Sequence, residues 1–148
     1  MAMRRFMFNK LARNKSVKNF EKKGVVCKIK RLTDNEEFLE ALTKKIVEEL
    51  EEVFESQSQE ELISELADVE EVFYSFKKLL HITQKEVDAA RVTKKAERGD
   101  FEERLYVEYA DIPESVTDEI EYFESQPDRY PEVDPKTGKY IGIDEDEE

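Results

Sequence analysis

Three helix-start signals follow one another along the chain and constrain its fold more than any other feature. Each has Asp, Ser or Thr followed three residues later by Glu, the capping-box pattern that satisfies backbone N–H groups in a first helical turn. They begin at Asp34, Ser58 and Thr83. Because short connections make successive helices antiparallel neighbours, we expect an all-α fold, an antiparallel helical bundle. The three helices are expected over residues 34–55, 58–80 and 83–98.

The flanking segments carry weaker signals. Residues 15–23 are typical of a short basic helix that ends at Gly24, and residues 114–125 are typical of one further helix. Short extended segments are expected near the N-terminus, at residues 25–29, and after the last core helix, at residues 101–109. No alternation of strands and helices indicates a parallel sheet.

Charge divides the chain. Residues 1–31 hold 11 lysines and arginines against one acid, whereas residues 102–148 hold 17 acids against four basic residues and end in five acids at 144–148. We therefore expect one domain over residues 1–110, with a basic N-terminal arm, and an acidic extension over 111–148 that is partly disordered or docked. The aromatic residues available to anchor this extension are Tyr122, Phe123, Tyr130 and Tyr140.

Composition excludes several classes of protein. No apolar run approaches the roughly 20 residues that span a membrane, and the N-terminus has no secretory signal, so we expect a cytoplasmic protein that does not enter membranes. Cys27 is the only cysteine, which excludes an intramolecular disulfide. The net charge of −13 and a basic arm without interleaved aromatic residues disfavour nucleic acid as a partner.

Two carboxylate pairs lie on successive expected helices, Glu49 with Glu52 and Glu65 with Asp68. Residues three apart are neighbours on a helix surface, and an antiparallel hairpin would bring the two pairs together. Oxygen ligands of this kind suit Mg²⁺, for which Mn²⁺ can substitute. The alternative is chance, because 37 of the 148 residues are acidic and such pairs also arise on solvated faces.

The phase of the two helices favours the metal site. At 100° per residue, Glu49 and Glu65 lie at the edges of apolar stripes, where a carboxylate is costly to desolvate without a partner. The stripes consist of Leu39, Leu42, Ile46, Leu50 and Val53 on the first helix, and of Leu62, Leu66, Val69, Phe73, Phe76 and Leu80 on the second.

Other catalytic arrangements lack their residues. His81 is the only histidine and follows two leucines at a helix end, where we expect a capping or packing residue. Zinc sites and nucleophilic triads are therefore unsupported. The four glycines are scattered, so the chain has neither a P-loop nor a dinucleotide fingerprint. Carboxylate chemistry with a divalent cation and nearby basic residues remains.

Four short motifs occur in a characteristic order: FNKLARNK at 8–15, EELEE at 48–52, ELADV at 65–69 and KKAERGDF at 94–101. With these motifs the chain resembles the MazG-like all-α nucleotide pyrophosphohydrolases, in particular the branch with an N-terminal Y-N-K-L-V-R-D-K-I-P segment. The resemblance covers about residues 6–109. It implies a bundle of the MazG-like type, Mg²⁺-dependent cleavage of a nucleoside triphosphate into the monophosphate and pyrophosphate, and a homo-oligomer, either a dimer or a tetramer.

The resemblance implies the metal ligands, and the chemistry of such a site suggests roles for nearby residues. The metal ligands would be Glu49, Glu52, Glu65 and Asp68. Glu48 would orient or deprotonate the attacking water as the catalytic carboxylate. The substrate phosphates would be bound by Lys10 and Arg13 in the arm and by Lys94, Lys95 and Arg98. The last three residues have an alternative reading as a basic last turn that the helix dipole favours.

Departures from the family pattern leave substrate choice open. Asn14 stands where the family segment has Asp, Ser16 and Val17 replace Ile-Pro, and Asp100 replaces the second Gly of R-G-G-F. Phosphoribosyl-ATP pyrophosphohydrolysis is a narrower alternative on the same scaffold. A non-catalytic helical interaction module with a structural cation site is the alternative from another class.

Apolar residues outside the centres of the two stripes favour a second copy of the chain as a partner. They are Val47, Phe54, Val72 and Leu79. A thin bundle covers such surface most readily by self-association. The alternative is a monomer in which a fourth helix and the C-terminal extension cover it.

Overall fold

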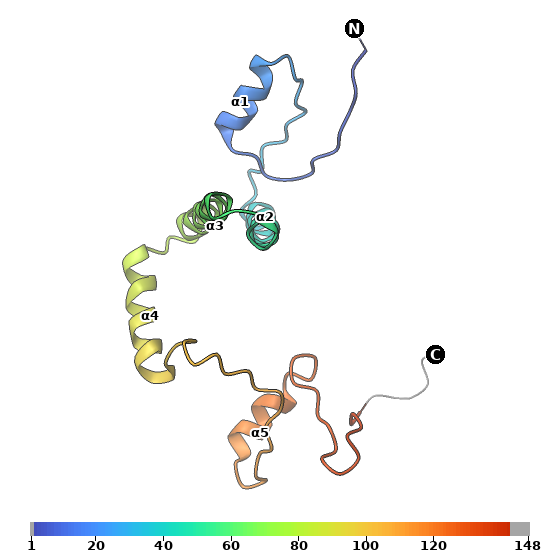
Figure 1. Cartoon of the computed structure of the whole chain (residues 1–148), viewed down its shortest axis with the longest axis vertical. Helices are drawn as coiled ribbons and strands as arrows, with labels where there is room; N and C mark the ends of the chain where they lie inside the picture. The colour runs from blue at the N-terminus through green and yellow to red at the C-terminus, as the bar shows by residue number, and fades with distance from the viewer. Residues whose placement is uncertain (1, 143–148) are drawn as a thin grey trace. The chain divides into compact units, whose positions relative to one another are not determined.

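The computed structural model describes residues 2–142, and the acidic end at 144–148 lies outside that range. The described chain is all-α and contains no strand (Figure 1). None of its helices is long and apolar enough to cross a lipid bilayer. The chain divides into two units, Met1–Gly99 and Asp100–Glu148. The helices are α1 (Asn14–Lys22), α2 (Asn35–Glu55), α3 (Gln59–Leu79), α4 (Gln84–Arg98) and α5 (Thr117–Glu124).

The three capping signals start helices where the sequence predicts them. Each cap side chain accepts a hydrogen bond from the backbone N–H three residues later, at 3.0 Å for Asp34, 3.1 Å for Ser58 and 3.2 Å for Thr83. The box at Thr83 is complete, because the carboxylate of Glu86 accepts a hydrogen bond from the Thr83 N–H at 2.7 Å. Local chemistry therefore fixes the starts of α2, α3 and α4.

His81 ends α3 through its backbone conformation. Its φ of 56° lies in the left-handed region, and the N–H of Ile82 donates to the carbonyl of Lys77 at 2.9 Å. With the N–H of His81 donating to the carbonyl of Lys78, this is the hydrogen-bond pattern of a Schellman motif. The expected capping role of His81 is confirmed.

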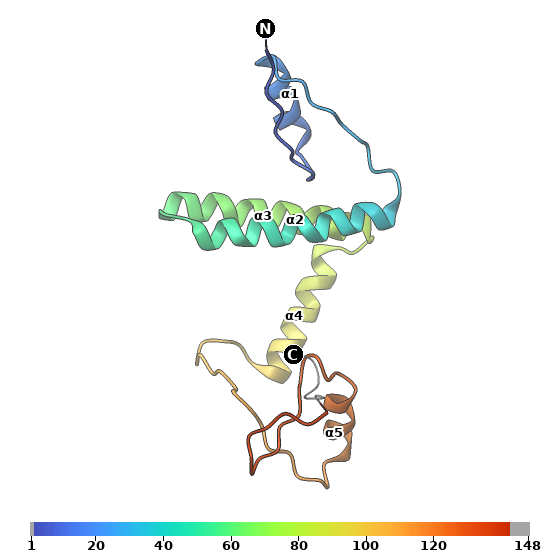
Figure 2. The same cartoon turned by 90° about the vertical axis from the view of Figure 1, so that its right-hand side faces the viewer.

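Helices α2 and α3 form an antiparallel hairpin across the turn at residues 56–58 (Figures 1 and 2). Theirs is the only extensive contact between two helices in the described part of the chain. The all-α class is thus established, and the predicted antiparallel arrangement is present in this pair. The complete MazG-type bundle stays a prediction.

The seam of the hairpin is small and contains one acid. Leu42 on α2 and Val69 and Val72 on α3 are the buried hydrophobic residues of the described chain, and Glu49 is buried with them. Burial of Val72 corrects the prediction that it lies outside the centre of its stripe as uncovered apolar surface. Three members of the predicted stripes stay about half exposed: Leu50, Leu66 and Phe73. The faces along which α2 and α3 meet are therefore rotated, relative to the predicted apolar stripes, towards the side that carries Glu49.

The second unit contains α5 and an aromatic cluster. Tyr122, Phe123 and Tyr130 pack edge to face or tilted, with ring centroids 4.7 Å apart for Phe123 and Tyr130. An isolated antiparallel bridge joins Val133 and Tyr140. Three of the four aromatic residues expected to anchor the extension thus pack against each other within their own unit.

Candidate metal centre

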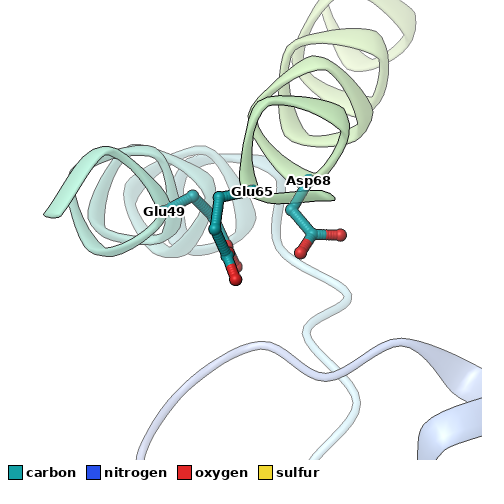
Figure 3. A group of neighbouring side chains, drawn as sticks. All are labelled: Glu49, Glu65 and Asp68. Atoms are coloured by element: carbon teal, nitrogen blue, oxygen red, sulfur yellow. The ribbon is translucent and has the colours of Figure 1, made fainter. Parts of the chain in front are cut away.

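Three carboxylates meet on the hairpin, Glu49 from α2 and Glu65 and Asp68 from α3 (Figure 3). One oxygen from each lies within 4.8 Å of the others. Helix periodicity explains the meeting, because Glu49 follows Leu42 by two turns and Glu65 precedes Val69 by one, which places both acids on the faces that form the seam. We call these three residues the carboxylate cluster.

Burial leaves two oxygens of the carboxylate cluster without partners. Glu49 is 6% exposed, and within residues 2–142 neither its Oε2 atom nor Oε2 of Glu65 has a hydrogen-bond partner. The pKa of Glu49 is raised, and burial is the largest cause of this shift. The nearby charge of Glu52 raises the pKa further, whereas Lys45 lowers it. Buried carboxylate oxygens without partners are costly. A hard divalent cation would supply the missing partner, and the all-oxygen donor set fits Mg²⁺.

Glu52 lies at the margin of this group. Its effect on the pKa of Glu49 places it near that residue, but its carboxylate is not among the three whose oxygens gather. The structure thus brings together three of the four predicted ligands and leaves Glu52 beside one of them.

Glu48 is held in two ion pairs. Its Oε1 atom accepts from Nζ of Lys10 at 2.9 Å and from Nζ of Lys45 at 3.3 Å. The hydrogen bond from Lys10 is the largest cause that lowers the pKa of Glu48. A carboxylate held in its ionised form is a weak base, so this environment suits the orientation of a water molecule better than its deprotonation.

Arg13 connects the basic arm to α3. One guanidinium nitrogen lies 2.9 Å from Oδ1 of Asp68, and the other lies 3.8 Å from a carboxylate oxygen of Glu71. Lys10, three residues earlier, bonds to Glu48 on α2. The arm therefore fastens to both helices, and its two predicted phosphate-binding residues lie at the acids of the site.

The other predicted phosphate-binding residues, Lys94, Lys95 and Arg98, lie on the last turns of α4 and are exposed. No hydrogen bond or ion pair joins Lys94 or Arg98 to the carboxylate cluster in the described chain. Their part in phosphate binding stays a prediction.

Lys45 is the residue of this site that the sequence analysis did not identify. Its Nζ atom lies 3.1 Å from Oε1 of Glu49, and its side chain is 18% exposed. Burial lowers the pKa of Lys45, but the hydrogen bonds that its ammonium group donates to Glu49 and Glu48 outweigh burial, so the net pKa is raised. The only signal in the sequence was the four-residue spacing to Glu49, which is common in a chain with 41% charged residues.

A pocket of about 280 Å³, lined by charged and apolar groups, lies between the arm and α2. The arm contributes residues 9–11, and the segment before α2 contributes Leu32. Helix α2 itself contributes Glu37, Glu40, Ala41, Lys44, Lys45 and Glu48. Lys45 and Glu48 thus line the pocket and also take part in the ion pairs around Glu49.

Comparison of the chain with protein-family models, with curated proteins and with solved structures gives no match. The functional proposal therefore rests on the carboxylate cluster and on the residue pattern.

Proposed function

We propose that the protein is a Mg²⁺-dependent nucleotide pyrophosphohydrolase that converts nucleoside or deoxynucleoside triphosphates into monophosphates and pyrophosphate. The observation that carries the proposal is the pair of buried, unpartnered oxygens of Glu49 and Glu65 beside Asp68. Three carboxylates without a cation repel one another in a partly buried site. The expected cytoplasmic location would give the protein access to both nucleoside triphosphates and Mg²⁺.

The reaction adds water across the α–β anhydride, so that pyrophosphate leaves and one proton is released. The carboxylate cluster, with Glu52 at its margin, would hold Mg²⁺, for which Mn²⁺ can substitute. Bound there, the cation would neutralise phosphate charge and make a water more acidic.

The remaining contributions come from side chains around the cluster. Glu48 is ionised and held between Lys10 and Lys45, so its free acceptor oxygen can orient the attacking water. Arg13 and Lys10 carry positive charge to the edge of the site, where they can compensate phosphate oxygens.

Product analysis tests this proposal directly. The full chain is incubated with Mg²⁺ and a panel of normal and damaged nucleoside triphosphates, together with phosphoribosyl-ATP, the substrate of the narrower alternative. We expect a monophosphate and pyrophosphate in equal amounts, and no reaction after chelation. Release of orthophosphate and a diphosphate would contradict the proposal, because water would then attack at the γ-phosphate.

A non-catalytic helical interaction module with a structural cation is the second candidate. The ion pair between Arg13 and Asp68 favours it, because a protein cation already neutralises part of the cluster. A cation that raises the Tm while no substrate of the panel is hydrolysed would identify this alternative.

A further inference from the structure

We propose that the pocket between the arm and α2 binds the polyphosphate group of the substrate, with Lys44 and Lys45 as its cations. The inference rests on the proposed function, because it assigns a ligand to a pocket beside the same site. The pocket of about 280 Å³ is lined by both lysines. Neither residue belongs to the phosphate-binding set that the sequence predicts.

Lys45 is the structural link between the pocket and the carboxylate cluster. It lines the pocket, and its Nζ atom lies 3.1 Å from Oε1 of Glu49. A phosphate group in the pocket could therefore contact Lys45, the same side chain that contacts Glu49 of the carboxylate cluster. This arrangement suits a ligand that is shared between lysines and a metal ion on the carboxylates.

The charge of the pocket explains why binding of a polyphosphate should need the metal. Glu48 is compensated by Lys10 and Lys45, and Glu37 is compensated by Lys30 at 2.6 Å. The pocket also contains Glu40, so its acids and bases nearly balance. Without a divalent cation nearby, a highly charged anion gains little there.

Lys44 and Lys45 differ in whether their ammonium groups are already paired before a phosphate group binds. Lys44 has no hydrogen bond or ion pair in the described part of the chain, so it can contact phosphate at once. Lys45 is occupied by Glu48 and Glu49. Once the charge of Glu49 is neutralised by a divalent cation, Lys45 no longer compensates it, and its ammonium group can donate to a phosphate oxygen instead.

Calorimetric titration of the full chain with pyrophosphate tests the assignment without any turnover. We expect pyrophosphate to bind in the presence of Mg²⁺ and to bind at least tenfold more weakly without it. Lys44→Gln and Lys45→Met should each weaken the Mg²⁺-dependent binding by about tenfold, the effect of losing one charge-assisted hydrogen bond. Lys78→Gln, which alters an exposed lysine of α3, should leave it unchanged.

A second titration with Mn²⁺ alone separates phosphate binding from a merely structural role of Lys45. Lys45→Met should bind Mn²⁺ at least as tightly as the native chain, because the competing ammonium group is gone. Loss of Mn²⁺ binding together with pyrophosphate binding would overturn the proposal and make Lys45 a support for Glu49. Circular dichroism confirms that each variant is folded.

Glu40→Gln identifies the kind of ligand that occupies the pocket. Removal of a repelling carboxylate should tighten pyrophosphate binding, whereas a pocket for a sugar hydroxyl would lose nucleoside affinity and leave pyrophosphate binding unchanged. The latter result would overturn the assignment, as would native pyrophosphate affinity in Lys44→Gln. Mg²⁺-dependent pyrophosphate binding that depends on both lysines, in a protein without hydrolytic activity, would support the pocket and refute the proposed reaction.

Discussion

Glu49 occupies a seam position that a helical hairpin would ordinarily give to an apolar residue. It lies two turns after Leu42 and is as deeply buried as its hydrophobic neighbours. Burial raises its pKa because the interior disfavours the charged form, and Lys45 offsets only part of that cost. A buried acid that faces two further acids is a candidate ligand of a bound cation.

Replacement of Glu49 by Gln should therefore separate stability from function. The neutral amide avoids the cost of a buried charge, so we expect a higher Tm for the metal-free variant, no further rise on addition of Mg²⁺, and hydrolysis reduced at least about 100-fold. Thermal unfolding with and without Mg²⁺ and a pyrophosphate-release assay measure these effects. Glu51→Gln, an exposed change on the same helix, is the matched control. Undiminished hydrolysis in Glu49→Gln would exclude Glu49 as a ligand.

Arg13 competes with a cation for Asp68. Its ion pair at 2.9 Å is partly exposed, and ion pairs near the surface contribute only about 0.2–1 kcal/mol to stability. Arg13→Gln should thus change the Tm little, while the affinity for Mn²⁺ alone rises severalfold as Asp68 is released. Electron paramagnetic resonance of free Mn²⁺ measures the affinity, and Lys15→Gln in α1 is the control. A lower affinity would instead assign to Arg13 the orientation of Asp68.

At the scale of the elements, local chemistry made the helices predictable. The caps at Asp34, Ser58 and Thr83 need only residues within one turn, so the pattern alone located the starts of α2, α3 and α4. The face along which α2 meets α3 was not predictable, because both helices have more apolar positions than one contact can bury. The outcome, with Val72 inside and Phe73 about half exposed, depends on the pairing of the two helices.

The carboxylate cluster shows the same division. Spacing and phase, which are properties of single helices, indicated the pairs Glu49 with Glu52 and Glu65 with Asp68. Which of these carboxylates gather depends on the pairing of the two helices, and that left Glu52 at the margin. Lys45 was not identified because only its burial distinguishes it from other lysines spaced four residues from a glutamate. Periodicity does not predict that burial.

The capping box of α4 should make the start of this helix sensitive to acid. The backbone hydrogen bond from Thr83 is the largest cause that lowers the pKa of Glu86 below its ordinary value of 4.5. The stabilisation is therefore present above that value and is lost as the pH falls through the lowered pKa of the folded state. Amide chemical shifts at residues 83–87 should move towards random-coil values as the pH falls through that lowered pKa. Glu86→Gln should abolish this pH dependence, and an unchanged acid transition in that variant would contradict the assignment.

At the scale of the whole molecule, the hairpin leaves apolar surface uncovered. Phe54 is 93% exposed and Val47 is 53% exposed, as expected for residues outside the packed stripes. Burial of a phenylalanine side chain stabilises an interface by roughly 1.5–3 kcal/mol. Self-association is the simplest way for one chain to gain that free energy.

We expect the protein to be at least a dimer at micromolar concentration. Sedimentation equilibrium should show that Phe54→Asp weakens the assembly, because a charged side chain would then be desolvated at the interface. Phe101→Asp, at a residue that is 95% exposed in the second unit, should not weaken it, and deletion of residues 126–148 should leave it intact. A monomeric native chain would contradict the expectation, and dissociation after the deletion alone would move the interface into the extension.

The arm and the hairpin are held by forces that respond differently to the solvent. Lys10 and Arg13 fasten the arm through partly exposed ion pairs, whereas α2 and α3 meet through the apolar contacts of Leu42, Val69 and Val72. The screening length falls from about 10 Å at 0.1 M salt to about 3 Å at 1 M. Concentrated salt should therefore loosen the arm while the two helices stay paired, and dilution should restore it. We therefore expect Glu48 and Asp68 to become more exposed as the ionic strength rises, and to lose that exposure again on dilution.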